Sequence, residues 1–126
     1  MALREIIFRG KRLDNGEWVE GNYWEFCGDH NILVPGNCIG LRVDPSTVGQ
    51  YTGLMDKNGE RIFEGDVLTL DGEYGFFVLE FQEDTARFVM SGDSVVVDFD
   101  NFWSYEVEVV GNIHDNPEYL EEGEEE

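Results

Sequence analysis

Cysteine and histidine side chains are the first residues of this chain whose spacing could support chemistry. Cys27 and His30 are three positions apart, and Cys38 follows shortly after. These residue types bind zinc, but a structural zinc site takes four ligands, usually arranged in two close pairs. His114 would complete the set only if folding brought it near. The incomplete set predicts no bound zinc and two reduced thiols, the usual state in a cytoplasmic protein.

Acidic residues form the second candidate cluster. Asp93, Asp98 and Asp100 are close in sequence, and Asp98 and Asp100 are expected on one face of the same strand. Paired carboxylates can hold a hard cation or share a proton, as in a small metal-dependent hydrolase. Because the chain has 28 acidic residues, chance pairs are expected, and a solvated acidic face is the simpler interpretation.

Signatures of known catalytic machinery are missing from the sequence. It contains no serine–histidine–acid signature, no phosphate-binding glycine loop with its lysine and no metalloprotease motif. The sequence therefore assigns no catalytic, cofactor-binding or metal-binding residue and no cofactor.

Aromatic side chains are the third candidate group, because an exposed set could stack on bases or receive a peptide. The candidates are Trp18, Tyr23, Trp24, Phe26, Trp103 and Tyr105. In a chain of this size we expect most of them to belong to the core. Trp18 and Trp24 should lie on the same side of one strand and share one environment.

We expect strands to position these residues, because no stretch of the sequence repeats apolar residues at the 3.6-residue spacing of a helix over three turns. Residues 6–9, 17–26 and 31–34 are predicted as strands of an N-terminal lobe, with a hairpin turn at Asp14-Asn15-Gly16. Residues 35–40 are expected to form a loop. Residues 44–47 have the composition of a turn or a single helical turn.

The second half of the chain predicts five short antiparallel strands, at residues 66–70, 76–82, 86–90, 94–99 and 106–113. Residues 76–81 are apolar on both faces and should form the central, most buried strand. Alternation places Val95, Val97 and Phe99 on one face, and the expected core is Phe77, Leu79, Val97, Val107 and Val109. Five such strands with short turns are typical of a small SH3-like barrel, with a 3₁₀ turn at residues 102–103.

The turns and ends complete an all-β prediction. Residues 56–59 have the composition of a type I turn between two apolar segments, and Gly59 and Gly65 should adopt positive φ. Asn116-Pro117-Glu118 is typical of a helix start. We expect an N-terminal β-hairpin lobe at residues 1–64, an SH3-like barrel at 65–115, and a short helical turn with an acidic tail at 116–126, packed as one compact unit.

The charge of the chain excludes several classes of partner. The formal net charge is −20, and about −14 remains without the six Glu of residues 118–126. Because such a field repels polyanions, we expect no binding to nucleic acid or to anionic membranes. Basic residues cluster weakly, at Arg4, Arg9, Lys11 and Arg12. No run of 18 apolar residues or secretory leader is visible, which favours a cytoplasmic location.

Three separated blocks of the sequence form an ordered pattern. The first joins residues 7–10 to 16–21, the second runs from 44–54 through the turn at 56–59 to 65–67, and the third joins 110–113 to 116–118. In this order, the blocks resemble the YopX family of small phage and prophage proteins. The resemblance implies a phage-associated, cytoplasmic, β-rich protein without a settled biochemical activity. It supplies no catalytic residues. The Glu-rich end after Leu120 departs from the family pattern.

These observations favour a non-enzymatic module that binds a host or phage protein. Because the surface of the chain is acidic, we expect this partner to be basic. Two alternatives stay open, a small metal-dependent hydrolase and a structural subunit that assembles into homo-oligomers through strand edges. Converging acids in a deep pocket would favour the enzyme, and a flat apolar patch would favour assembly.

Overall fold

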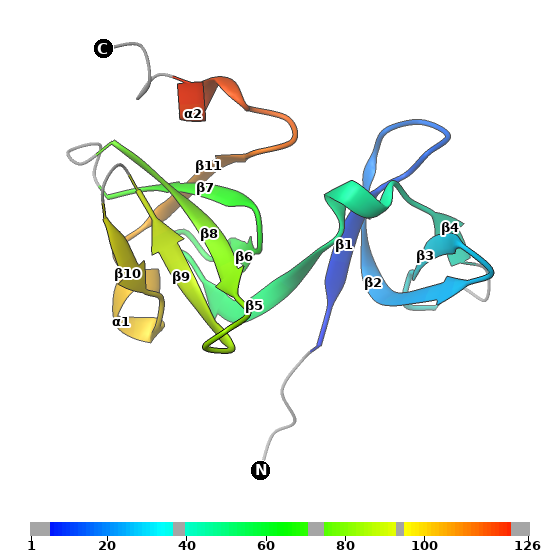
Figure 1. Cartoon of the computed structure of the whole chain (residues 1–126), viewed down its shortest axis with the longest axis horizontal. Coiled ribbons are helices and arrows are strands. Elements are labelled where there is room, and N and C mark those ends of the chain that lie inside the picture. Colours follow the sequence, from blue (N-terminus) through cyan, green and yellow to red (C-terminus); the bar gives the residue numbers. More distant parts are fainter. Residues whose placement is uncertain (1–5, 37–39, 71–74, 93–94, 122–126) are drawn as a thin grey trace. The chain divides into compact units, whose positions relative to one another are not determined.

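The computed structural model describes residues 6–36, 40–70, 75–92 and 95–121 (Figure 1). The described chain is an all-β structure with two antiparallel sheets and very little helix. By internal packing it forms two units, Met1–Tyr51 and Thr52–Glu126. Residues 52–64, which the sequence grouped with the N-terminal lobe, pack in the second unit.

The first unit is a sheet of antiparallel strands. Its elements are β1 (Phe8–Lys11), β2 (Trp18–Phe26), β3 (Asp29–Leu33), β4 (Gly40–Arg42) and the start of β5 (Gly49–Met55), in the spatial order β4-β3-β2-β1-β5. The predicted turn at Asp14-Asn15-Gly16 joins β1 to β2, and Asn15 Oδ1 accepts a hydrogen bond from the Glu17 amide at 2.9 Å. This hairpin prediction is confirmed.

A single 3₁₀ turn, Pro45–Thr47, lies between β4 and β5. Asp44 caps it, because its Oδ1 accepts a hydrogen bond from the Ser46 amide at 3.1 Å. The Thr47 hydroxyl accepts one from the Lys11 amide at 2.9 Å, which ties the turn to β1. The predicted helical turn is therefore present, and it is held in place by side chains of the turn itself.

The second unit begins within β5 and contains the five-stranded sheet. After β6 (Arg61–Phe63), the neighbour of β5, come β7 (Asp66–Thr69), β8 (Phe76–Gln82), β9 (Arg87–Ser91), β10 (Val96–Asp98) and β11 (Glu108–Asn112), in the spatial order β10-β9-β8-β7-β11. Two helices of one turn each, α1 (Asn101–Ser104) and α2 (Glu118–Glu121), complete the described elements. The α1 helix replaces the predicted 3₁₀ turn.

The core of the second unit confirms most of the predicted inward positions. Its buried members are Ile62, Leu68, Phe77, Leu79, Met90, Phe99 and Val107, and Val97 and Val109 pack against them partly buried. Complete burial of residues such as Leu79 stabilises by roughly 1.5–3 kcal/mol each. Val95 does not follow the predicted alternation, because 47% of its surface is exposed and β10 begins only at Val96.

The prediction of a most buried strand at residues 76–81 is wrong in its second half. β8 is central in the sheet, but its Glu80 and Phe81 are exposed, whereas all four residues of β7 are buried. The reason is the register. β7 pairs with Phe76, Phe77 and Val78, so Glu80 and Phe81 extend beyond it and pair with β9.

Gly59 and Gly65 adopt the predicted positive φ, at 83° and 92°. Gly59 closes the turn that starts at Asp56, and its amide donates to the Asp56 carbonyl at 3.0 Å. Gly65 links elements far apart in sequence. Its amide donates to the Leu79 carbonyl at 2.7 Å, and its carbonyl accepts from the Ile113 amide at 2.9 Å. Residues with a β-carbon resist this backbone region, which explains glycine at both positions.

Candidate functional site

The cysteine and histidine residues are not assembled into a described metal site. Cys27 is an exposed free thiol, and Cys38 lies outside the described residues. His30 is engaged by Tyr23, whose hydroxyl hydrogen-bonds Nδ1 at 2.5 Å and whose ring stacks on the imidazole at 5.9 Å. Within residues 6–36, 40–70, 75–92 and 95–121, no group of three or more His, Cys, Asp or Glu side chains could hold a metal ion.

The candidate aspartates separate into different structural roles. Asp98 ends β10 and forms an ion pair with Arg87 across the β9–β10 pairing, with 3.2 Å between Nε and Oδ1. Asp100 lies beyond the strand, and its Oδ1 accepts a 3.4 Å hydrogen bond from the Trp103 amide at the start of α1. The expectation that Asp98 and Asp100 share one strand face is therefore wrong, because the strand ends between them. Asp93 lies outside the described residues.

Aromatic residues divide between the core and the surface. Trp103 packs against the core of the second unit, and Tyr23 is half-buried between Phe8 and His30. Trp24, Phe26 and Tyr105 are instead exposed, so the expectation that most of the six aromatic candidates belong to the core is wrong. An aromatic residue is buried only where another element covers its face of the sheet, and the local sequence does not contain that information.

Trp18 and Trp24 also differ, against the expectation of a shared environment. Trp18 is half-buried because two cations of β1 cover its ring, with the Arg9 guanidinium at 4.7 Å and the Lys11 ammonium at 5.7 Å from the centroid. Trp24 contacts the ring of Phe26 at 5.8 Å and remains 46% exposed. The end of β2 therefore presents an open aromatic surface.

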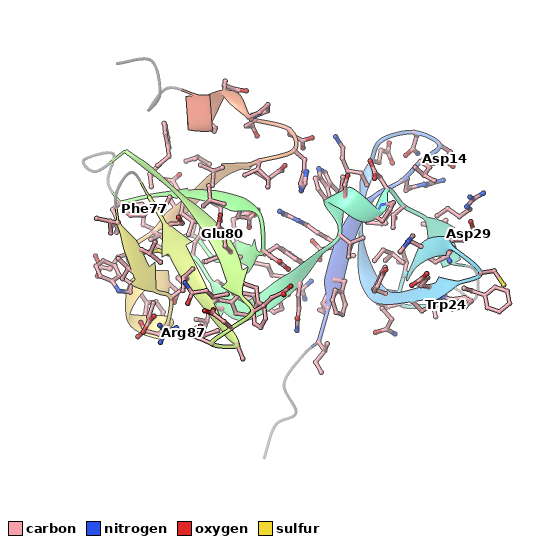
Figure 2. All side chains as sticks on the ribbon, viewed as in Figure 1. Asp14, Trp24, Asp29, Phe77, Glu80 and Arg87 are labelled. Carbon is pink, nitrogen blue, oxygen red and sulfur yellow. The ribbon has the colours of Figure 1, made fainter. Side chains whose placement is uncertain are left out.

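The β2–β3 turn positions this surface (Figure 2). Cys27 and Gly28 form a two-residue loop with left-handed φ values of 53° and 86°, the conformation of a type I′ hairpin turn. The turn pairs Phe26 with Asp29 and Trp24 with Asn31, and paired residues share a face of the sheet. Arg42, opposite Asn31, binds the Asp29 carboxylate at 2.9 Å. An aromatic pair, a carboxylate and a guanidinium thus meet on one face.

A second guanidinium–carboxylate pair holds the loop between β1 and β2. Arg12 donates hydrogen bonds from two nitrogens to the Asp14 carboxylate, at 2.9 and 2.7 Å. The hydrogen bond from Arg12 lowers the pKa of Asp14 below its ordinary value and raises the pKa of Arg12. Exposed pairs of this kind contribute little to stability, so we interpret this one as an ordering contact within the loop.

The two units carry very different charges. Residues 1–51 contain five basic and seven acidic side chains, a net charge of −2, whereas residues 52–126 contain three basic and 21 acidic side chains, a net charge of −18. Exposed carboxylates of the second unit lie on its sheet, turns and helices, and among them are Glu60, Glu80, Glu83, Asp84, Asp98, Asp100, Glu106 and Glu118. The negative field therefore belongs to a folded surface as well as to the C-terminal residues.

Comparison with known protein families identifies a match. The YopX protein family matches residues 7–121. The chain belongs to the YopX family. The match covers nearly the whole chain and confirms the resemblance carried by the three sequence blocks. No curated protein matches this YopX chain.

The residues that carry the YopX resemblance have structural roles, and Asp56 is the clearest example. Its carboxylate is only 4% exposed and accepts three backbone hydrogen bonds, from Asn58 at 2.8 Å, Glu60 at 2.9 Å and Val109 at 2.9 Å. The first two close the turn, and the third attaches the turn to β11. The Asp-x-Asn-Gly composition signals such a turn, but the bond to Val109 spans 53 positions and has no local signal.

Asp66 has a similar role in the second turn of the YopX pattern. It is 1% exposed, and its Oδ2 accepts a hydrogen bond from the Phe63 amide at 2.7 Å. Buried carboxylates with a cleft and a reaction partner would indicate catalysis, but Asp56 and Asp66 accept hydrogen bonds from backbone amides.

The helices among the described residues are too short to cross a membrane.

Proposed function

We propose that this YopX chain is a non-enzymatic protein-interaction module whose acidic second unit binds a basic host or phage protein. The observation that supports the proposal is the charge difference between the units, −2 against −18. A folded surface with one sign of charge attracts an oppositely charged partner and orients it before contact. The same field disfavours nucleic acid, because few basic side chains are available to release phosphate counterions.

The proposal includes a cellular setting and a fold description. We place the chain in the cytoplasm, since an exposed free thiol such as Cys27 is usual in a reducing compartment. We propose that its role is phage-associated, as the YopX resemblance implies. We also propose that strands β7 to β11 are a small barrel of the SH3-like type, in which curvature would protect the sheet edges.

The test compares removal of charge from the folded surface with removal of the same charge from the C-terminus. One triple variant carries Glu80→Gln, Glu83→Gln and Asp84→Asn, all exposed on β8 or in the turn after it. The matched control carries Gln in place of Glu124, Glu125 and Glu126. Both remove three negative charges, so they differ only in where the charge was.

The probe is a purified basic DNA-binding protein, and the readout is its association rate over a range of salt concentrations. We expect binding to weaken as the Debye length falls from about 10 Å at 0.1 M to about 3 Å at 1 M salt. The triple variant at Glu80, Glu83 and Asp84 should associate several-fold more slowly than wild type. The association rate of the C-terminal control should change less. Salt-independent binding, equal effects of the two variants or micromolar binding to duplex DNA would contradict the proposal.

A further inference from the structure

The exposed ring pair at the end of the β2–β3 hairpin lacks an explanation in the packing of the first unit. Trp24 is 46% exposed and Phe26 is 62% exposed, and their centroids are 5.8 Å apart. Within the described part of the chain, Phe26 provides the ring contact of Trp24. Neighbouring exposed aromatic residues beside charged groups are typical of an interaction surface, since burial of such rings on binding is strongly favourable.

The same sheet already shows which group fits such a ring. The positions of Trp18 and Trp24 on β2 differ by an even number, so their side chains project to the same side of the sheet. The face of Trp18 is covered by the Arg9 guanidinium at 4.7 Å. A guanidinium stacks on an indole because it is planar, weakly hydrated and attracted by the electron-rich ring.

A carboxylate next to the ring pair supplies the other half of arginine recognition. Asp29 is the cross-strand partner of Phe26, and it already accepts a 2.9 Å bond from the Arg42 guanidinium. Asp29 and Arg42 are both about half exposed, so a further cation could approach the second face of this carboxylate from solvent. Planar stacking beside a carboxylate is the combination that favours arginine over lysine.

We propose that Trp24 and Phe26, with Asp29, form the contact site for an arginine side chain of the basic protein partner. This inference rests on the proposed function and adds to it the place on the chain and the chemical group that is recognised. Because the first unit has a net charge of only −2, its contact should depend less on salt than the attraction exerted by the second unit. The acidic unit would then set the association rate, and the ring pair would prolong the complex.

The experiment uses the full chain and a short Arg-Gly-Ser repeat peptide as the probe. A citrulline analogue of the peptide keeps the shape of arginine and removes its charge. The test variant is Trp24→Ala with Phe26→Ala, and Trp24→Leu keeps an apolar side chain without the aromatic face. Tyr105→Ala is the matched control, because Tyr105 is an aromatic residue that is 71% exposed in the second unit.

We expect the double variant to bind the arginine peptide roughly 3- to 30-fold more weakly than wild type, the range expected for one or two cation–π contacts. Trp24→Leu should lose part of this affinity, and Tyr105→Ala should be close to wild type. The ratio between wild type and double variant should persist as salt is raised. In a titration followed by NMR, the Trp24 indole signal should move on addition of the arginine peptide and stay in place with the citrulline analogue.

The outcomes separate this inference from the proposed function. Equal affinity of the double variant and wild type would overturn the ring-pair site, and so would equal binding of the citrulline peptide. A mobility shift of oligothymidylate that disappears in the double variant would assign the rings to bases and also overturn it. In each of these cases, salt-dependent binding of the basic protein that requires Glu80, Glu83 and Asp84 would leave the proposed function standing. Because Trp24 and Phe26 are exposed, melting temperatures near wild type are expected and serve as the folding control.

Discussion

Replacement of Asp56 should destabilise the second unit more than replacement of any exposed acid. Asp56→Ala removes a buried carboxylate and leaves the amides of Asn58, Glu60 and Val109 without their acceptor. A buried donor without a partner costs about 1–3 kcal/mol. Asn58 and Glu60 are exposed, so water can replace part of their loss, whereas Val109 is half-buried in β11. We therefore expect a loss of about 3–5 kcal/mol, a large share of the roughly 5–15 kcal/mol typical of a domain.

Asp56→Asn divides this effect into its parts. The side-chain oxygen of asparagine can still accept the hydrogen bonds that Oδ1 or Oδ2 of Asp56 accepts. Its NH₂ group replaces the other oxygen and cannot accept a hydrogen bond from the backbone amide there. With Oδ1 retained, the bonds to Asn58 and Glu60 survive and the bond to Val109 is lost. The expected cost is about 1–3 kcal/mol, between wild type and alanine. Asp44→Ala is the control, because Asp44 also caps a turn but lies in the first unit.

The assay is denaturant unfolding followed by tryptophan fluorescence. With Trp18→Phe and Trp24→Phe in the background, Trp103 reports on the second unit alone, because it packs against that core. The units are analysed separately, since a chain with two units need not unfold in one step. A loss below about 1 kcal/mol for Asp56→Ala, or an effect of Asp44→Ala of equal size on Trp103, would refute the assignment of Asp56 as the link between turn and strand.

Four further predictions concern single sites. Gly59→Val should cost about 1 kcal/mol or more because φ is 83°, and an unchanged melting temperature would count against it. Leu79→Ala should cost roughly 2–5 kcal/mol, since Leu79 is fully buried, as measured by the midpoint of unfolding. Arg12→Gln should raise the pKa of Asp14 toward its ordinary value, as measured by an NMR titration. Because the pKa of Asp14 is lowered in the folded chain, the small stabilisation by this pair is present at neutral pH. It disappears as the pH falls through that lowered pKa. Elemental analysis should find no stoichiometric zinc, and a chelator should leave the unfolding curve unchanged.

Strand patterns predicted the second unit better than the first, and the reason lies in side-chain alternation. The bounds of β8 agree with the predicted residues 76–82 because an apolar run between turn residues defines it at both ends. Two strands that the sequence missed, β4 in the first unit and β6 in the second, have only three residues each, too few to show a period. β5 contains Gly49 and Gly53, which interrupt the pattern of a strand. These strands depend on partners distant in sequence, such as the pairing of Gln50 with Phe8.

The sequence predicted which residue types form the aromatic candidate site, but it did not predict that their side chains are exposed. The sequence names Trp24 and Phe26 as aromatic residues of one strand, and burial statistics place such residues in the core. Their exposure follows from the length of β2, which continues past its pairing with β1 and carries both rings to the end of the hairpin. Trp18 lies opposite Lys11 in that pairing and is covered. Coverage of a residue by a neighbouring strand is a property of the tertiary fold.

The YopX resemblance and the proposed contacts fall on different residues, and this separation is itself informative. Asp56, Gly65 and Thr47 connect turns to distant strands, so they explain why the motif blocks occur together without requiring a shared reaction. Trp24 and Phe26 lie outside those blocks, and 46% and 62% of their surfaces are exposed. Substitutions in the motif should therefore change the unfolding curve, whereas substitutions in the ring pair should change binding at constant stability. In this chain the fold would then act as the support that carries the ring pair.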